Sequence, residues 1–351
     1  MTYIAKPRID LPGEPVNKVG LKRRDYEGVI STLCAGCGHD SITAAIVQAF
    51  WEMSIAPEKV IKLSGIGCSS KTPAYFISGA HGFNSVHGRM PSIATGALAA
   101  NRDLVCIGVS GDGDSLSIGF GQFGHAVRRN VNMLYIIENN GVYGLTKGQF
   151  SASADRGTKS KKGSVNRMRS IDPVATAIAM GGSFVARSFS GDRDQLVTLI
   201  KAGVKHRGCA VLDVVSPCVT FNDHEGSTKS YAYTRSHYNP AVNADYIPPS
   251  EEIMADYDEG DTMPVTMHDG SVVLLRKTDS HYVPTLRSAA MRYLEAHSAR
   301  GEVVTGLLFI NEGMPLVHDI AGTSDEPLTK LDYDSLNPGS EALARLQNRM
   351  R

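Results

Sequence analysis

Two short polar segments of this 351-residue chain have residue types and a spacing that suit a divalent metal ion bound to a diphosphate. They are Gly111-Asp112-Gly113-Asp114 and Asn139-Asn140-Gly141-Val142-Tyr143-Gly144. Asp112 offers a carboxylate, Asn140 an amide oxygen and Val142 a backbone carbonyl, and Mg²⁺ prefers such hard oxygen ligands. The glycines on either side of Asp112 let a phosphate approach the backbone because no Cβ intervenes. One glycine- and acid-rich segment alone is typical of an ordinary turn, whereas this pair favours a metal site.

The elements that must position these segments alternate between buried strands and amphipathic helices. Apolar runs predict strands at 60–63, 104–109, 133–137, 184–186 and 210–215, and the helical period predicts helices at 40–53, 91–100, 115–128, 172–180 and 192–206. Strands that alternate with helices form a parallel sheet with right-handed crossovers. The predicted fold class is therefore α/β, with a doubly wound parallel sheet.

This pattern places several chemically active side chains at one edge of the sheet. Four of them follow the carboxyl ends of predicted strands: Cys68, Asp112, Asn140 and Cys218. Cys34 and Cys37 precede the helix at 40–53, whose N-terminus faces the same edge. Open α/β sheets bind their ligands at that edge. The sequence therefore predicts that a cofactor and a metal cluster are neighbours there.

Four of the six cysteines can act together as thiolate ligands. They are Cys34, Cys37, Cys68 and Cys218. Thiolates bind zinc or iron–sulfur clusters, and the wide separation along the chain suits a [4Fe–4S] cluster held by a preformed fold. On spacing alone, ordinary core cysteines are an equal alternative. Cys106 is predicted to be a core residue in a strand, and Cys209 lies before a strand at the opposite edge.

Five ordered motifs give the chain a family resemblance. They are Ser31-Thr-Leu-Cys-Ala-Gly-Cys-Gly-His39, Gly65-Ile-Gly-Cys-Ser-Ser-Lys71, His87-Gly-Arg89, Tyr143-Gly-Leu-Thr-Lys-Gly-Gln149 and Ser216-Pro-Cys-Val-Thr-Phe221. Together with the paired metal segments, they resemble the beta subunit of 2-oxoacid:ferredoxin oxidoreductases over roughly residues 20–240. The resemblance implies the thiamine-diphosphate-binding fold, with Mg²⁺ and a [4Fe–4S] cluster on the four cysteines named above.

The resemblance also implies roles for individual residues. The cofactor-binding set is Ile66, Gly67, Cys68, Ser69, His87, Gly111, Asp112, Gly113, Asp114, Asn140, Val142, Gly144 and Leu145, with Asp112, Asn140 and Val142 on the Mg²⁺. The catalytic set is His87, Arg89, Lys71, Leu145, Thr146 and Lys147. For His87 the alternative is a structural histidine, for Arg89 a loop-locking contact, and for the two lysines solvated surface residues.

The implied reaction is the oxidative decarboxylation of a 2-oxoacid with coenzyme A, with electrons leaving through the cluster to ferredoxin, or the reverse reaction. Segments beyond residue 240 resemble 2-oxoglutarate-specific members more than pyruvate-specific ones. The alternatives are pyruvate or broad 2-oxoacid specificity, a non-redox thiamine-diphosphate decarboxylase or carboligase, and a zinc-stabilised interaction subunit. The family's activating glutamate belongs to a pyrimidine-binding domain that this chain has no room for. We therefore expect an alpha subunit, in a heterodimer or a dimer of heterodimers.

Composition indicates which classes of partner are unsupported and where the domain boundaries lie. The chain has 36 basic and 36 acidic residues, which gives no argument for nucleic acid or a membrane surface as a partner. It contains no apolar run of about 20 residues and no signal-peptide pattern, which indicates a cytoplasmic location. The predicted division is an N-terminal arm at 1–27, the cofactor- and cluster-binding domain at 28–240, and a C-terminal extension and tail at 241–351. A basic loop at 147–169 could receive coenzyme A phosphates or an acidic ferredoxin, or be an ordinary solvated loop.

Overall fold

Apolar strands buried on both faces form the centre of the protein. The computed structural model describes residues 13–146, 148–157, 164–216, 218, 253–267 and 272–350. Within these ranges nine strands form one sheet in the order β2-β1-β3-β4-β8-β7-β11-β10-β9. The strands are β1 (Val60–Ser64), β2 (His81–Asn84), β3 (Val105–Gly111), β4 (Met133–Asn139), β7 (Phe184–Phe189), β8 (Cys209–Val215), β9 (Thr262–Thr266), β10 (Val272–Lys277) and β11 (Glu302–Ile310). A two-stranded ribbon pairs β5 (Val142–Tyr143) with β6 (Gln149–Phe150).

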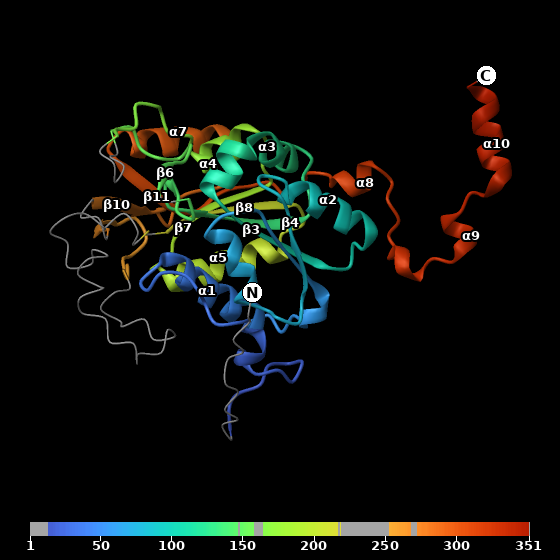
Figure 1. Cartoon of the computed structure of the whole chain (residues 1–351). Helices are drawn as coiled ribbons and strands as arrows, with labels where there is room; N and C mark the ends of the chain where they lie inside the picture. Colours follow the sequence, from blue (N-terminus) through green and yellow to red (C-terminus); the bar gives the residue numbers. More distant parts are fainter. Residues whose placement is uncertain are drawn as a thin grey trace.

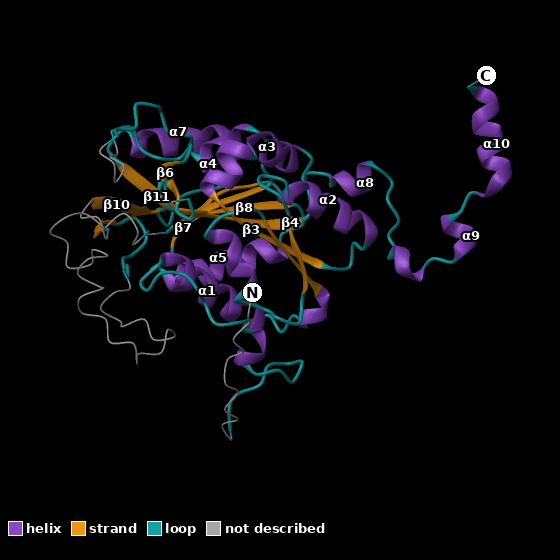
Figure 2. Ribbon diagram, in the orientation of Figure 1, coloured by secondary structure: helices purple, strands orange, loops and turns teal. Residues whose placement is uncertain are grey.

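Helices cover both faces of the sheet (Figures 1 and 2). The longer helices are α1 (Gly38–Glu52), α2 (Met90–Ala100), α3 (Phe120–Arg128), α4 (Pro173–Ala179), α5 (Arg193–Lys205), α7 (Arg287–Ser298) and α10 (Gly339–Arg349). The short ones are α8 (Val317–Ile320), α9 (Tyr333–Leu336), the 3₁₀ turns η1 (Arg23–Tyr26), η2 (Pro57–Lys59), η3 (Ser69–Ala74) and η6 (Leu328–Lys330), and the π-helical turn η4 (Gly113–Ile118). None of the helices in these ranges is long and apolar enough to cross a membrane.

The hydrophobic core has two halves, one on each side of the sheet. In Figure 1, α2, α3, α4 and α7 cover the upper face, while α1 and α5 cover the lower face. The core under the upper helices includes Met90, Phe123 and Val174, and the core above the lower helices includes Phe50 and Leu196. Polar N-cap residues begin two of these helices. Asp172 accepts hydrogen bonds from the Val174 and Ala175 amides of α4, and Asp192 accepts one from the Gln195 amide of α5. The α/β class and the parallel core predicted from the sequence are confirmed.

Six neighbouring strands, from β2 to β7 in the sheet order, are mutually parallel. Beyond β7 the sheet continues with the C-terminal extension, because β11 pairs antiparallel with β7 and β10 pairs with β11. β9 and β10 are antiparallel, and the residues between them, 268–271, lie outside the described ranges. The extension is therefore part of the same sheet and not a separate appendage.

The structure differs from the sequence-based expectation in three places. The helix expected over 115–128 is divided at Gly119 into η4 and α3. The edge strand β2 was not expected, because its four residues are all exposed and lack an apolar pattern. Residues 13–27 pack against the domain instead of extending as an arm: Tyr26 is completely buried, and the Asn17 amide donates to the Trp51 carbonyl at 3.1 Å.

The chain ends in an extended arm, which we define as residues 322–350. It carries α9 and α10 away from the body of the protein (Figure 1). Tyr333, Leu343 and Met350 on this arm are 75 %, 54 % and 83 % exposed. The arm leaves the body after α8, at the edge of the sheet where β3 and β8 begin, since Asp319 pairs with Arg102 and Arg207.

Candidate cofactor and metal site

The pairing register brings the ends of three parallel strands to one edge of the sheet. Gly111 at the end of β3 is opposite Glu138 of β4, and Asn139 at the end of β4 is opposite Val215 of β8. The loops that follow these strands therefore start side by side. The predicted positions of Cys68, Asp112, Asn140 and Cys218, beyond the ends of β1, β3, β4 and β8, are confirmed.

Asp112 is buried at this edge, with a side chain that is held firmly. Its Oδ2 accepts hydrogen bonds from Ser151 Oγ and, at 2.5 Å, from Ser153 Oγ. Burial raises the pKa of Asp112, and the two serine hydroxyls oppose that increase because they stabilise the carboxylate. A buried carboxylate held through one oxygen has its other oxygen available for a cation.

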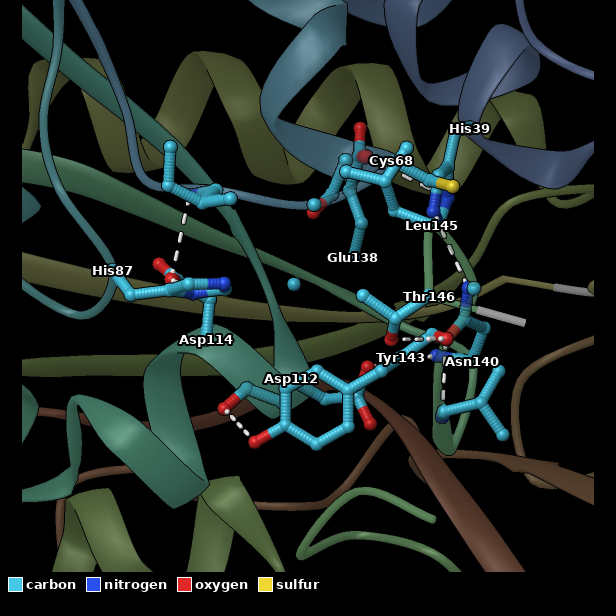
Figure 3. Close-up of a pocket in the computed structure, with 17 residues that line it drawn as sticks. His39, Cys68, His87, Asp112, Asp114, Glu138, Asn140, Tyr143, Leu145 and Thr146 are labelled. Carbon is cyan, nitrogen blue, oxygen red and sulfur yellow. Dashed lines mark hydrogen bonds and ion pairs between the residues drawn. The ribbon is translucent and has the colours of Figure 1, made fainter. Parts of the chain in front are cut away.

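Asn140 lies next to Asp112. Its backbone amide donates to Asp112 Oδ1 at 3.4 Å, so the two predicted Mg²⁺ ligands are close enough to share one ion. The Asn140 Oδ1 accepts from the Val142 amide at 3.1 Å, which fixes the turn between the two residues. Figure 3 shows the side chains of Asp112 and Asn140 on the same side of the pocket. Carboxylate, amide and carbonyl oxygens together form a donor set of the hard type that Mg²⁺ requires.

Asp114 joins three segments of the site. Its Oδ1 accepts from His87 Nδ1 at 2.5 Å, from the Gly88 amide at 2.9 Å and from the Ile66 amide at 3.3 Å. Its Oδ2 accepts from Ser110 Oγ at 2.6 Å. Asp114 therefore ties the loop after β1 and the His87 turn to the loop after β3, and it orients the His87 ring at the pocket mouth.

Two positions in the site must be glycine, because a Cβ there would collide with a neighbouring side chain. A Cβ at Gly65 would lie 1.8 Å from Asp114 Oδ2, and one at Gly113 would lie 2.6 Å from the Tyr143 ring. The Tyr143 hydroxyl donates to the Gly113 carbonyl at 3.0 Å, which keeps the ring over this loop (Figure 3). Side chains at these positions would displace Asp114 or the Tyr143 ring from their places at the strand ends.

One cavity collects every residue that the sequence predicts for cofactor binding. Its wall consists of His39, Ile66, Gly67, Cys68, Ser69, His87, Gly111, Asp112, Gly113, Asp114, Glu138, Asn140, Val142, Tyr143, Gly144, Leu145 and Thr146. Thr146 of the predicted catalytic set is also in the wall, whereas Lys71 and Arg89 are not. Lys71 Nζ donates to Thr32 Oγ1 at 3.5 Å, and Arg89 caps α2. Lys147 lies outside the described residues.

Of the four predicted cluster cysteines, Cys68 is in the wall of this cavity and Cys218 is in the wall of a second cavity that shares Asn140 and Val142 with it. Cys37 is the N-cap residue of α1, and Cys68 precedes η3. Burial raises the pKa of both thiols, and the charge of the nearby Cys218 raises each of them further; Cys34 also acts on Cys68. No three His, Cys, Asp or Glu side chains in the described ranges are grouped closely enough to hold a metal ion as they stand. The cluster assignment stays a prediction. Cys106 and Cys209 are buried in β3 and at the start of β8.

The sequence reasoning assigned no role to three residues of the wall. Tyr143 and His39 stand in motifs that were used only for the family resemblance. Glu138 ends the buried part of β4, and both its carboxylate oxygens are buried without a hydrogen-bond partner among the described residues. Burial raises the pKa of Glu138 well above its ordinary range and lowers the pKa of His39 to about 4. A carboxyl residue at the end of an apolar strand, directly before Asn139-Asn140, was the available signal.

Comparison with known proteins agrees with this geometry. The family description "Thiamine pyrophosphate enzyme, C-terminal TPP binding domain" matches residues 65–214, which begin directly after β1, end within β8 and include every residue of the cavity wall except His39. A solved structure, 2-oxoglutarate:ferredoxin oxidoreductase from Magnetococcus marinus with 2-oxoglutarate, coenzyme A and succinyl-CoA bound, is 28% identical. Its TM-score is 0.68, over 86% of this chain and 89% of that chain. The fold and the site therefore define a thiamine-diphosphate-binding α/β protein.

Two sequence relatives show which family of thiamine-diphosphate-binding proteins the chain belongs to. A 2-oxoacid:ferredoxin oxidoreductase subunit beta from Sulfolobus is 46% identical over 54% of this chain and 63% of its own length. The 2-oxoglutarate synthase subunit KorB of Methanocaldococcus jannaschii is 37% identical over 54% of this chain and 69% of its own length. The chain belongs to the family of 2-oxoacid:ferredoxin oxidoreductase beta subunits. It spans less than two thirds of the length of the Sulfolobus relative.

Proposed function

We propose that this chain is the beta subunit of a 2-oxoglutarate:ferredoxin oxidoreductase. The complete enzyme would convert 2-oxoglutarate and coenzyme A to succinyl-CoA and CO₂, pass the electrons through a [4Fe–4S] cluster to ferredoxin, and also catalyse the reverse reaction. The observation that carries this proposal is that one cavity at the carboxyl edge of β1, β3 and β4 has the whole predicted cofactor-binding set in its wall. Ferredoxin and reduced thiols favour a cytoplasmic enzyme.

The residues present fit a Mg²⁺–diphosphate group. Asp112, Asn140 and the Val142 carbonyl would hold the metal ion, with Gly111 and Gly113 beside the phosphates. The buried Asp112 has one oxygen bound by two serines and the other beside the Asn140 backbone amide, an arrangement that suits a cation. A positive charge there would compensate the burial that now raises the pKa of this carboxyl.

Thiamine diphosphate supplies, when bound, the nucleophile for the keto carbon of the 2-oxoacid and the stabilisation of the negative charge left when CO₂ departs. The protein's part is to bind and orient. We assign His87, held by Asp114, to a proton-carrying position at the mouth, and Leu145 and Thr146 to the reactive end of the cavity. Lys71 and Arg89 lie outside the wall, so their proposed contacts, like that of Lys147, are with the substrate or coenzyme A.

We assign the [4Fe–4S] cluster to Cys34, Cys37, Cys68 and Cys218. Three observations support this assignment: the first pair directly precedes α1, Cys68 lines the cofactor cavity, and Cys218 acts electrostatically on both Cys37 and Cys68. Four thiolates from separate loops of one fold suit such a cluster, whose chemistry is single-electron transfer. This placement would make the cluster a neighbour of the cofactor.

The relatives support the proposed substrate and partner. The Magnetococcus structure contains 2-oxoglutarate and coenzyme A, and the Methanocaldococcus relative is a 2-oxoglutarate synthase subunit, which supports 2-oxoglutarate as the preferred 2-oxoacid. An alpha subunit would supply the pyrimidine-binding domain and the activating glutamate, in a heterodimer or a dimer of heterodimers. The cavity edge of the sheet is where that subunit would complete the site.

The test is anaerobic co-purification with the alpha subunit, followed by analysis of iron, sulfide, Mg²⁺ and thiamine diphosphate. Turnover of 2-oxoglutarate and of pyruvate with a viologen dye then gives the substrate. Two cysteine variants form a matched pair: Cys37→Ala should lose the iron, whereas Cys209→Ala, buried at the opposite edge, should keep it.

Each alternative predicts a different result. A colourless, iron-free protein that holds thiamine diphosphate would indicate a non-redox decarboxylase or carboligase. Zinc without thiamine diphosphate or Mg²⁺ would indicate an interaction subunit. If pyruvate is turned over as fast as 2-oxoglutarate or faster, 2-oxoglutarate is not the preferred substrate.

A further inference from the structure

His39 lies between the two proposed sites. It is the second residue of α1, directly after the turn that carries Cys37, and its side chain is 1 % exposed. Its ring forms part of the wall of the cofactor cavity. Figure 3 shows His39 beside Cys68, with a hydrogen bond that runs to Asn140.

Both ring nitrogens of His39 have partners on other segments. Nδ1 is 2.7 Å from Ser216 Oγ and 3.5 Å from Glu138 Oε2, and Nε2 is 3.4 Å from the Asn140 Nδ2. An amide nitrogen can only donate, so His39 Nε2 must accept. The ring hydrogen is then on Nδ1, where it is donated to Ser216. Ser216 is two residues before Cys218, so one imidazole connects segments of both proposed sites.

These contacts determine which end of the Asn140 amide faces the metal position. His39 receives the amide nitrogen, and the Val142 backbone amide donates to the amide oxygen at 3.1 Å. A flipped amide would place N–H donors toward the cation and would set its nitrogen against the Val142 amide. It would also face the His39 Nε2 lone pair with an oxygen, unless the ring hydrogen moved from Nδ1, where Ser216 accepts it, to Nε2. Only the oxygen can be a metal ligand, because the amide nitrogen has no free lone pair.

We propose that His39 is a positioning residue for the metal-binding site: it orients Asn140 so that the amide oxygen faces Mg²⁺, and it ties this ligand to the segment before Cys218. The inference rests on the proposed function, since it requires Asn140 to be a metal ligand. Partners that orient metal ligands in this way typically change metal affinity by about 10- to 100-fold when they are removed.

The experiment compares two replacements of His39 in the complex with the alpha subunit. Gln offers an oxygen that can accept from Asn140, whereas Leu fills a similar space without an acceptor. After removal of divalent ions with a chelator, Mn²⁺ is titrated in the presence of thiamine diphosphate, and free Mn²⁺ is followed by its electron paramagnetic resonance signal. We expect His39→Leu to weaken Mn²⁺ binding by about 10- to 100-fold and His39→Gln to weaken it by less than about threefold.

Two further variants serve as controls. His318 is also a buried histidine, 3 % exposed, whose Nε2 is 3.0 Å from the Thr95 carbonyl near the opposite edge of the sheet. His318→Leu should bind Mn²⁺ like the native protein. Ser216→Ala removes the group that holds His39 Nδ1 and should weaken Mn²⁺ binding by about fivefold, even if His39→Leu fails to fold. The iron content of each variant shows whether the cluster segment remains intact.

Native-like Mn²⁺ affinity in His39→Leu or Ser216→Ala would overturn the inference. Equal losses in the Gln and Leu variants would also overturn it, because they would mean that His39 acts only through packing. A native complex that binds no Mn²⁺ would instead overturn the proposed function, together with this inference.

Discussion

At the scale of single residues, Glu138 is the least compensated group in the site. It is fully buried in the cavity wall, its oxygens have no hydrogen-bond partner of good geometry in the described part of the chain, and His39 Nδ1 is 3.5 Å from its Oε2. The nearby Thr72 hydroxyl opposes the rise of its pKa only in part. Burial raises the pKa of this carboxyl well above its ordinary 4.5. The folded protein therefore keeps a proton on Glu138 at pH values where the unfolded chain has lost it.

This difference predicts how stability depends on pH in the cofactor-free protein. Because the folded state binds more protons, the stability from Glu138 is complete below about pH 4.5 and is lost as the pH rises toward the raised pKa. One such group contributes a slope of up to about 1.4 kcal/mol per pH unit. Glu138→Gln should reduce the slope, and urea unfolding at a series of pH values measures it. Asp112 and Asp213, also raised by burial, leave a residual slope.

The control for this prediction is the exposed Glu295 of α7, because replacement by Gln there changes no buried charge. Glu295→Gln should unfold with the native slope. The prediction concerns the slope and not the absolute stability, since a buried Gln also introduces unpaired donors. Equal slopes for the native protein and Glu138→Gln would show that this carboxyl is already ionised in the folded state.

Asp112 gives a second prediction at this scale, about metal binding. Ser153 Oγ is 2.5 Å from Asp112 Oδ2 and 2.9 Å from Asn139 Oδ1. Its one hydrogen goes to the nearer carboxylate, so Ser153 orients Asp112 from a second loop. Ser153→Ala should weaken Mg²⁺ binding by about 10-fold, because the carboxylate loses an orienting donor. Titration calorimetry with thiamine diphosphate present measures this affinity.

Ser117 provides the matched control, because its hydroxyl contacts the Ala152 amide in the same loop but does not touch Asp112. Ser117→Ala should keep the native Mg²⁺ affinity. If both serine variants lose affinity equally, the loop and not the hydrogen bond to Asp112 determines metal binding.

At the scale of elements, a buried ion-pair network joins β7, β8 and α4. Arg187 Nε donates to Asp213 Oδ2 at 2.7 Å, and its Nη2 donates to Asp172 Oδ1 at 2.6 Å. Asp172 is also the N-cap of α4, and Asp213 accepts from Asn139 at the end of β4. The network thus fixes the edge of the sheet that carries the candidate metal ligands.

Removal of the arginine should destabilise the protein strongly. Arg187→Met leaves Asp213, which is 0 % exposed, as an uncompensated buried carboxylate, and breaking such a pair costs about 3–5 kcal/mol. The exposed pair of Arg207 with Asp319 is the control, and Arg207→Met should cost at most about 1 kcal/mol. Urea unfolding compares the two. Similar losses for both variants would show that the buried pair contributes no more than the surface pair.

Some helices and strands could be predicted from sequence patterns, and others could not. Buried parallel strands and capped helices follow from local residue types, so β3, β4, β8 and α5 lie within two residues of the expected bounds. The division of the helix over 115–128 does not follow from local pattern. A Cβ at Gly119 would lie 2.5 Å from the Asp114 carbonyl and 2.8 Å from Gly88, a contact between distant segments that local propensity does not contain.

The site shows the same limit. Its ligand-type residues could be predicted, because each follows a strand in a motif with its own chemistry. The orienting residues could not, since His39, Ser151 and Ser153 reach Asn140 and Asp112 only through the folded loops. β2 was also missed, because hydrogen bonding to β1 and not burial makes it a strand.

At the scale of the whole molecule, the C-terminal third contains two parts with different contacts. β9, β10 and β11 complete the sheet: β11 pairs with the fully buried β7, and Leu308 and Leu275 are completely buried. The arm at 322–350 carries exposed apolar residues and touches the body through the surface pair of Arg102 with Asp325. Sequence composition marked a change near residue 240, but it could not show that the sheet continues beyond it, because strand pairing is non-local.

Two truncations test this division. Deletion of residues 322–351 removes a surface ion pair worth about 0–1 kcal/mol and should lower the melting temperature by less than about 4 °C. Deletion of residues 253–351 removes three strands and exposes the edge of β7, so we expect aggregation and no cooperative transition. Fluorescence of Trp51, the single tryptophan, reports unfolding of the core because its indole donates to the Leu21 carbonyl at 3.1 Å on the far side of the sheet from α7. If the shorter protein unfolds cooperatively at the native temperature, the parallel strands form an independent domain and the antiparallel strands are an addition to it.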